Sequence, residues 1–293
     1  MSALKHILVL LCTFMMALPL HAQENTGFKG TSCVPVRTVD EEKLAFHAGE
    51  KMEFVLHYKW GAINADVGTA TVTLDSLRFN GQEAFRCRVF GKTSKFFDHF
   101  FMVRENFSSW FTRDGLRPLK FTRDTYEGGY EARNTYLYRW DAAEPYIAAD
   151  IYTSKMGQKS MDLPLTPCTY DLPALFFFAR NMDIENVEPG KKYPMTFAID
   201  EEVYNVYFIL YGRETIKVKG LGTVNTIKFA AKLLEGEVFK GEEDMMIWIS
   251  DDENRLPVYF EAPLRVGVAA GRMSGYEDLK YPFTSLVTNK KKK

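Results

Sequence analysis

From Phe46 onward, apolar and polar residues alternate along short segments rich in β-branched and aromatic side chains. In "KMEFVLHYKW" the apolar positions that share one face are Met52, Phe54, Leu56 and Tyr58. The segment "GTATVTLDSL" alternates in the same way between apolar residues and threonine. Because successive side chains of a β-strand point to opposite faces, a period of two predicts strands with one buried face.

Short turns that contain glycine separate these segments. "FNGQ" holds an Asn-Gly pair at Asn80 and Gly81, and "GLGTV" supplies a second glycine turn near Gly220. Such turns join adjacent antiparallel strands. We therefore expect a mainly β fold, with one large curved antiparallel sheet, either a half-barrel or a barrel, and one helix packed across it.

The helix is predicted where "TYDLPALFFFARNMD" interrupts the alternation. Asp171 is suited to cap the start of a helix, and Pro173 is suited to its first turn. We expect a helix over 171–183, between two β-rich stretches and on the concave side of the sheet. Its apolar positions recur at helical spacing: Leu172, Leu175, Phe176, Ala179 and Met182.

Two segments of the chain resemble each other. "SSWFTRDGLRPLKF" (108–121) and "MIWISDDENRLPVYF" (246–260) each run from a Trp through a hydroxyl residue and an acidic turn to a Pro and a Phe. The three adjacent acids at 251–253 fall in this turn. Asp side chains bond to nearby backbone amides in turns, whereas a catalytic pair needs a defined separation across a cleft. A turn is therefore favoured over a metal site or a catalytic site.

The N-terminus has the layout of a secretory signal. Lys5 and His6 precede an apolar run over 7–20, and the small Ala22 precedes the expected cleavage point. The run contains a proline and is shorter than the roughly 20 residues of a membrane span, so a signal peptide is favoured over an anchor. We expect an exported protein that is soluble or peripheral, without a transmembrane span. The expected divisions are a signal peptide (1–22), an N-terminal arm (23–45), a single β-rich domain (46–281) and a C-terminal tail (282–293).

The cysteine content limits the possible disulfides, and the charge content limits the expected binding partners. The exported part would keep Cys33, Cys87 and Cys168, which allow one disulfide and leave one thiol, with the pairing open. Cys87 lies in a predicted strand, where a packed thiol is expected. The chain has 37 basic and 38 acidic residues and no basic stripe, so nucleic acid is not an expected partner.

The most unusual stretch is "SKFFDHFFMVRENFSSWF" (94–111), with paired phenylalanines around Asp98 and His99. It predicts either a short helical turn that plugs one end of the sheet, the mouth of an apolar pocket, or a loop that touches a membrane. An exposed cluster of this kind favours aggregation unless it meets a lipid or a partner. The candidate ligand-binding residues are Phe96, Phe97, Phe100, Phe101, Tyr126, Tyr130 and Phe177.

Motifs for catalysis are absent from the sequence. The chain after residue 22 contains three histidines, and neither HExxH nor GxSxG occurs. "FGKTSK" (90–95) lacks the upstream glycine that a phosphate loop requires. We therefore expect no catalytic residues, no cofactor and no metal.

Three blocks carry a family resemblance: "SKFFDHFFMVRENFSSWFTRDGLRPLKFTRDTYEGGY", "YGRETIKVKGLGTVNTIKF" and "MIWISDDENRLPVYFEAPLRVG". In their order along 46–281 they resemble the exported bacterial family labelled domain of unknown function 3108. The resemblance implies a periplasmic protein of Bacteroidetes-like origin, and it transfers no activity. A more distant likeness in fold connects the Trp–turn–Pro pattern with periplasmic lipoprotein carriers, whose curved sheets enclose an apolar cavity.

These observations favour a non-catalytic periplasmic binding protein that holds an apolar or lipid-like envelope ligand. Two alternatives stay open. One is a cell-envelope assembly factor that acts through contacts with another envelope protein. The other is an enzyme on an envelope glycan, which would need a carboxylate pair in a cleft or a perturbed histidine.

Overall fold

The computed structural model describes residues 41–231, 244–264 and 266–287. The predicted signal peptide, Cys33 and most of the predicted arm lie outside the described residues. So does the last part of the predicted tail, residues 288–293.

Fifteen strands form one sheet in the order β8-β7-β6-β5-β4-β3-β2-β1-β15-β14-β13-β12-β11-β10-β9. All neighbours pair antiparallel except β9 and β10, which are parallel. The first eight strands are β1 (Lys51–Trp60), β2 (Ile63–Phe79), β3 (Gln82–Thr93), β4 (Val103–Thr112), β5 (Pro118–Glu127), β6 (Tyr130–Arg139), β7 (Tyr146–Thr153) and β8 (Gly157–Pro164). The others are β9 (Thr169–Tyr170), β10 (Lys192–Ile199), β11 (Glu202–Val218), β12 (Gly222–Ala231), β13 (Met245–Ser250), β14 (Pro257–Pro263) and β15 (Val268–Glu277).

The described helices are short. They are the 3-10 helices η2 (Glu41–Lys43) and η3 (Ile184–Asn186) and the α-helices α2 (Lys95–Asp98) and α3 (Leu172–Arg180). In the described segments, no helix combines the length and the hydrophobicity that crossing a bilayer requires.

The predicted alternation decides which side chains enter the core. In β1, Met52, Phe54 and Tyr58 are buried on one face. Asn80 and Gly81 both have positive φ, at 49° and 85°, and they form the tight turn between β2 and β3. This turn matches the right-handed twist of the strands it joins. The predicted mainly β fold, with a large curved antiparallel sheet, is confirmed.

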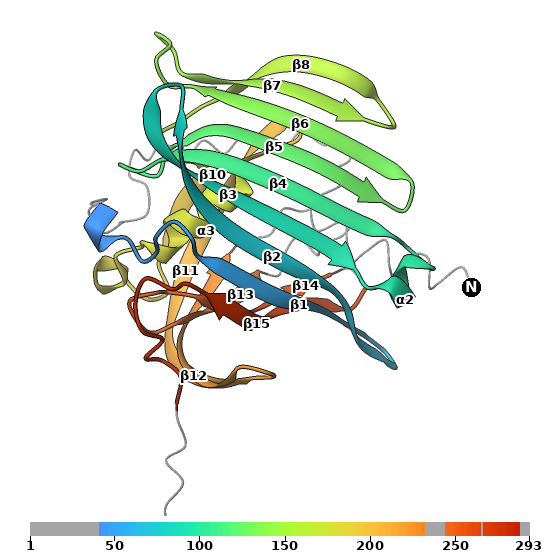
Figure 1. Cartoon of the computed structure of the whole chain (residues 1–293), viewed down its shortest axis with the longest axis vertical. Helices are drawn as coiled ribbons and strands as arrows, with labels where there is room; N and C mark the ends of the chain where they lie inside the picture. The colour runs from blue at the N-terminus through green and yellow to red at the C-terminus, as the bar shows by residue number, and fades with distance from the viewer. Residues whose placement is uncertain (1–40, 232–243, 265, 288–293) are drawn as a thin grey trace, which may run out of the picture.

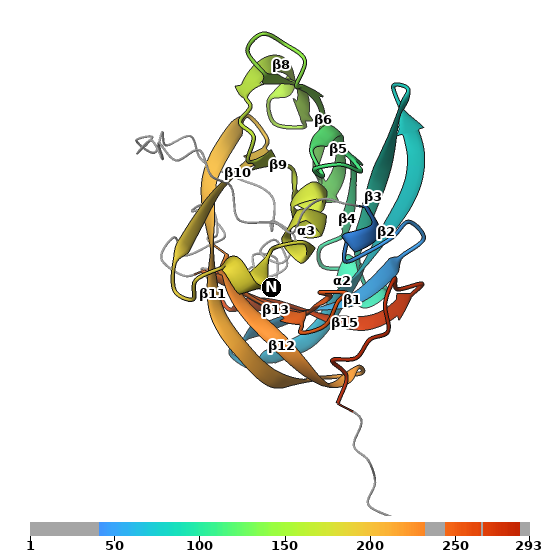
Figure 2. The same cartoon turned by 90° about the vertical axis from the view of Figure 1, so that its left-hand side faces the viewer.

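Helix α3 lies inside the curve of the sheet, between the strands of the two halves (Figure 2). The Asp171 side chain accepts a hydrogen bond from the Ala174 amide at 2.9 Å, and Pro173 occupies the first turn, as predicted. The helix ends at Arg180, three residues before the predicted end. Its buried face contacts β3 and β4 and joins the largest apolar core of the molecule.

The two similar segments form closely matched hairpins. In β4–β5, the Thr112 amide donates to the Arg117 carbonyl, and the Thr112 hydroxyl accepts from the Arg117 amide. In β13–β14, Ser250 makes the same two bonds with Leu256. In both hairpins the pairing shifts by one residue directly after the Trp, and a residue of positive φ, Leu116 or Arg255, stands two positions before the second strand.

The acids at 251–253 belong to the second hairpin turn, which confirms that prediction. The Asp252 carboxylate accepts from the Ser250 hydroxyl at 2.8 Å and from the Asn254 amide at 3.1 Å. It also accepts from the Ser285 amide at 3.1 Å. The first residues of the predicted tail are thereby held on the sheet, where Leu286 forms a bridge with Val224.

The cysteines divide into two kinds. Cys87 is a free, fully buried thiol on β3, and burial raises its pKa well above the ordinary value. Cys168 is disulfide-bonded. Because Cys87 is free, the partner of Cys168 lies outside the described residues.

Candidate functional site

Four connections of the sheet lie along the end marked by α2 (Figure 1). They join β1 to β2, β3 to β4, β5 to β6 and β7 to β8 and, together with the strand ends beside them, they comprise residues 59–62, 94–102, 126–130 and 154–156. We call this set of residues the α2 end. It contains most of the residues that the sequence singled out as a candidate site.

An ion pair fixes the β3–β4 connection. The Arg104 guanidinium donates to both oxygens of Asp98, at 3.0 and 2.7 Å, and the Thr93 hydroxyl donates to the same carboxylate. The Arg104 charge holds the pKa of Asp98 below its usual range. A bidentate pair of this type orients the backbone as well as the side chains. The phenylalanines beside Asp98 are therefore held in a defined turn.

Three of these phenylalanines, Phe96, Phe97 and Phe100, form an aromatic cluster and differ in their exposure to solvent. The Phe96 ring contacts the Phe97 and Phe100 rings, with centroid separations of 5.2 and 5.4 Å. Phe97 packs inward against a small core that includes Tyr58 and Val67. Phe96 is 67% exposed and Phe100 is 40% exposed. The turn is thus anchored by Phe97 and presents Phe96 and Phe100 to the outside.

Phe101 lies against the neighbouring β5–β6 turn. A Cβ atom added to Gly128 would lie 2.0 Å from the Phe101 ring, so only glycine leaves room for this contact. The Gly128 amide also donates to the Met102 carbonyl at 2.9 Å. Two of the four connections are therefore packed onto each other.

The remaining predicted residues do not enter one common pocket. Tyr126 and Tyr130 flank the same turn, but the burial pattern of their strands places Tyr126 on the outer face and Tyr130 on the inner face. The expectation that Phe177 faces the same space as the phenylalanine turn is wrong. Phe177 is fully buried in the α3 core against Phe46 and Phe111, whereas Phe97 belongs to a separate core. Helical spacing indicated which face of α3 is apolar but not which neighbour covers it.

Sequence reasoning missed other exposed apolar residues at this end. Among the described residues, six of the ten large apolar side chains that are exposed belong to the α2 end: Trp60, Phe96, Phe100, Met102, Tyr126 and Met156. A signal for two of them was available in the sequence, because Trp60 and Met156 each directly precede a glycine, a residue typical of turns.

A buried polar cluster lies on the inner face of the same region, and the sequence did not reveal it. Glu105 on β4 and Glu127 on β5 have adjoining carboxyl groups. Burial raises the pKa of Glu127 well above its usual range, and the neighbouring Glu105 carboxyl raises it further. Burial also raises the pKa of Glu105. Each carboxyl group in such a contact disfavours the charged form of the other.

The same cluster joins the two halves of the sheet. Arg123 on β5 is buried and donates to Asp200 at 2.7 Å, although Asp200 lies in the β10–β11 turn. Asn134 donates to the same carboxylate at 3.0 Å, and the Tyr136 hydroxyl donates to the Asp200 carbonyl at 2.6 Å. Because strands β8 and β9 are the two edges of the sheet and do not pair, side chains make this closure.

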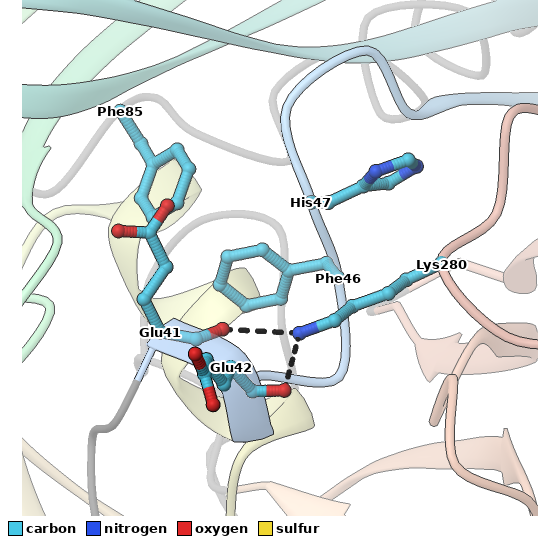
Figure 3. A pocket seen from close by; sticks show the side chains of 6 residues that line it. All are labelled: Glu41, Glu42, Phe46, His47, Phe85 and Lys280. Carbon is cyan, nitrogen blue, oxygen red and sulfur yellow. Dashed lines mark hydrogen bonds between the residues drawn. The ribbon is translucent and has the colours of Figure 1, made fainter.

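A cavity of about 510 Å³ lies at the opposite end of the sheet, beside η2 (Figure 3). Phe46 and Phe85 form its aromatic wall, and Glu41, Glu42, His47 and Lys280 surround it. The Lys280 ammonium donates to the carbonyls of Glu41 and Glu42 at 3.0 and 2.8 Å. Arg113 donates to the Glu41 carboxylate at 2.9 and 3.1 Å. Because these charges already have partners, the cavity offers mainly aromatic contact to a ligand.

A known protein family matches this chain. The family model described as "Protein of unknown function (DUF3108)" matches residues 53–274, which is most of the chain. The chain belongs to the DUF3108 family. The predicted family resemblance is confirmed, and no curated protein matches the chain.

Solved structures place this DUF3108 protein among β-barrel-like folds. A β-barrel-like protein of domain of unknown function DUF1849 from Brucella abortus is similar, with a TM-score of 0.52 and 10% identity. The match covers 85% of this chain and all of the other. A candidate lipoprotein from Parabacteroides distasonis matches with a TM-score of 0.26 and 11% identity, over 80% of this chain and 99% of the other. At such identities, the first likeness shows the fold alone.

The chemistry that the DUF3108 chain can perform at these places is limited by the groups present. Among the described residues, no group of three or more His, Cys, Asp or Glu side chains is placed to hold a metal ion. The α2 end offers apolar contact surface, the cavity offers aromatic contact, and the Glu105–Glu127 pair offers carboxyl groups with raised pKa values. Of these, the α2 end differs most from an ordinary protein surface, because it exposes several large apolar side chains.

Proposed function

We propose that this DUF3108 protein is a non-catalytic, exported binding protein that holds an apolar, lipid-like ligand of the cell envelope at the α2 end. The observation that carries the proposal is the concentration of exposed apolar side chains on this one end of the sheet. Large exposed apolar patches on soluble domains mark contact with a protein, a membrane or a ligand.

The geometry of the phenylalanine turn supports a binding role. The Asp98–Arg104 ion pair and the half-buried Phe97 hold the turn, so Phe96 and Phe100 are positioned before a ligand arrives. A pre-positioned contact loses little conformational entropy on binding. Burial of apolar surface contributes about 25 cal/mol per Å², which needs no specific polar partner.

The carboxyl groups support the non-catalytic part of the proposal. A glycosidase keeps its two carboxyls roughly 5–9.5 Å apart, so that the sugar and a water molecule fit between them. Glu105 and Glu127 instead adjoin each other, inside the sheet. Arg123 and Asp200 fill the space beside them with an ion pair. This arrangement leaves the pair a structural role.

Export to the periplasm fits two observations. Residues 1–22 have the layout of a signal peptide. Cys168 is disulfide-bonded, and disulfides persist in oxidising compartments such as the periplasm. We therefore place the ligand among the lipids and lipid-like molecules of the envelope.

The test is native mass spectrometry of the mature chain purified from a bacterial periplasm, followed by organic extraction. We expect a stoichiometric apolar adduct that extraction removes and that the double variant Phe96→Ser, Phe100→Ser no longer carries. Tyr211→Ser is the matched control, because Tyr211 is 55% exposed and lies on β11, outside the α2 end. A ligand-free wild-type mass, with melting unchanged by envelope lipids, would reject the proposal and favour contact with an envelope protein.

A further inference from the structure

Exposed lysines accompany the apolar tips of the α2 end. In three of its four connections, an exposed lysine directly precedes an exposed apolar residue: Lys59 before Trp60, Lys95 before Phe96, and Lys155 before Met156. These pairs lie in the β1–β2, β3–β4 and β7–β8 connections, which are far apart in the sequence. The fold brings the three pairs to the same end of the sheet.

The three ammonium groups have no carboxylate partner in the part of the chain that the structure describes. Some lysines elsewhere do have such partners: Lys51 pairs with Glu277, and Lys159 pairs with Glu201. The Lys155 ammonium lies over the Tyr130 ring, 5.5 Å from the ring centroid. The positive charges of the α2 end are thus available to an anionic partner.

Three carboxylates near these connections have a cationic partner. Asp98 is paired with Arg104, and Glu201 is paired with Lys159. Glu131 lies 3.6 Å from the Arg133 guanidinium. Along these connections, the free charge is therefore positive and stands beside apolar tips.

Basic and aromatic side chains at one level are suited to a lipid surface. Aromatic residues settle in the interfacial layer of a bilayer, and lysines extend their ammonium groups toward the phosphates. A small apolar ligand in solution needs no ammonium groups at three separate turns, whereas a plane of phosphates contacts all three at once. The charge pattern therefore matches an extended anionic surface.

We propose that the α2 end docks on the surface of an anionic lipid bilayer. Trp60, Phe96, Phe100 and Met156 enter the interfacial layer, and the ammonium groups of Lys59, Lys95 and Lys155 contact lipid phosphates. This inference rests on the proposed function and specifies that the protein contacts the lipid as part of a bilayer surface. Each lysine is expected to strengthen binding about fivefold, because a basic residue near an anionic leaflet contributes about 1 kcal/mol.

The test is flotation of the mature chain with vesicles of two compositions, pure phosphatidylcholine and phosphatidylcholine with one third phosphatidylglycerol. We expect binding to the anionic vesicles, and loss of that binding at about 1 M salt, where the Debye length falls to about 3 Å. The triple variant Lys59→Gln, Lys95→Gln, Lys155→Gln should bind the anionic vesicles about 100-fold more weakly. The matched control is the triple variant Lys192→Gln, Lys217→Gln, Lys219→Gln, which makes the same charge change outside the α2 end, at exposed lysines at the start of β10 and the end of β11.

The outcomes separate the inference from the proposed function. Equal binding to both vesicle compositions, or equal weakening by the two triple variants, would overturn the inference. Full retention of vesicle binding by Phe96→Ser, Phe100→Ser would also overturn it, because a purely electrostatic attachment needs no apolar tips. A lipid adduct in native mass spectrometry, combined with any of these three results, would leave the proposed function intact. Neither adduct nor vesicle binding would overturn both.

Discussion

The Arg180 guanidinium donates to both oxygens of the Glu50 carboxylate, at 2.6 and 3.1 Å, in the interior of the protein. Arg180 ends helix α3, and Glu50 directly precedes β1. The guanidinium also donates to the Asn254 carbonyl in the β13–β14 turn, at 2.9 and 3.1 Å, and to the Ala45 carbonyl at 3.1 Å. One buried cation therefore joins the helix to two segments that are distant in the sequence, the one before β1 and the β13–β14 turn.

Glu50→Gln is expected to lower the free energy of unfolding by about 3–5 kcal/mol, because it leaves a buried guanidinium without its counter-charge. Equilibrium denaturation in urea measures the change. Glu277→Gln is the matched control, since the carboxylate of Glu277 is 66% exposed in its pair with Lys51 and such pairs contribute about 0–1 kcal/mol. Equal effects of the two variants would contradict this account of Arg180.

Gly128→Ala tests the contact between Phe101 and the β5–β6 turn. Gly128 and Gly61 have nearly the same φ, at 55° and 53°, so alanine meets the same backbone strain at both, about 1 kcal/mol. A Cβ atom at Gly61 has no neighbour within 4 Å, whereas one at Gly128 overlaps the Phe101 ring. We expect Gly128→Ala to lower the free energy of unfolding by about 1–3 kcal/mol more than Gly61→Ala. A difference near zero would show that Phe101 moves aside freely.

Asp171→Asn is expected to change how stability depends on pH. Burial raises the pKa of Asp171 to about 7 in the folded state. The folded protein therefore binds a proton that the unfolded chain releases near pH 4, and the wild type loses stability as the pH rises from about 4 to 7. Asn caps a helix as well as Asp and carries no charge. Relative to wild type, Asp171→Asn should gain up to about 4 kcal/mol over this range, measured as the free energy of unfolding at several pH values. A constant difference across this range would contradict the raised pKa.

Glu127→Gln addresses the carboxyl pair inside the sheet. Because the pKa of Glu127 is raised in the folded state, the stabilisation of its protonated form is present at low pH and is lost as the pH rises through the folded pKa. Gln keeps a hydrogen-bond donor toward Glu105 at every pH. The advantage of Glu127→Gln over wild type should therefore grow with pH in denaturation experiments. The control Glu131→Gln changes an exposed carboxyl in the next strand, and its effect should stay level.

Local patterns were sufficient for the elements of the fold. Alternation identified the buried face of β1, and Asp171 with Pro173 identified the start of α3, because these signals arise within one turn or one strand. The partners of a face are set by the whole sheet. Phe177 was therefore assigned to the wrong neighbours, although its helix was predicted correctly.

Local sequence patterns could not predict the buried charges, for a related reason. Arg123 and Glu127 occupy inward positions of β5, where the sequence shows polar residues and gives no sign of burial. Their burial depends on Asp200, which is 77 positions from Arg123 in the sequence. The exposed apolar side chains of the α2 end were partly predictable, since the paired phenylalanines were visible in the sequence. Only the topology places Trp60 and Met156 at the same end of the sheet.

The strand order has a consequence for folding. Within the described sheet, every hydrogen-bonded neighbour is also the next strand in the sequence, except that β1 pairs with β15. Lys51 and Glu277 in that pair are separated by 226 positions. Pairings between close segments form early because they lose little loop entropy, whereas distant pairings form late. The chain should thus assemble as two independently growing meanders, and zipping of β1 onto β15 should be the slow event that completes the native state.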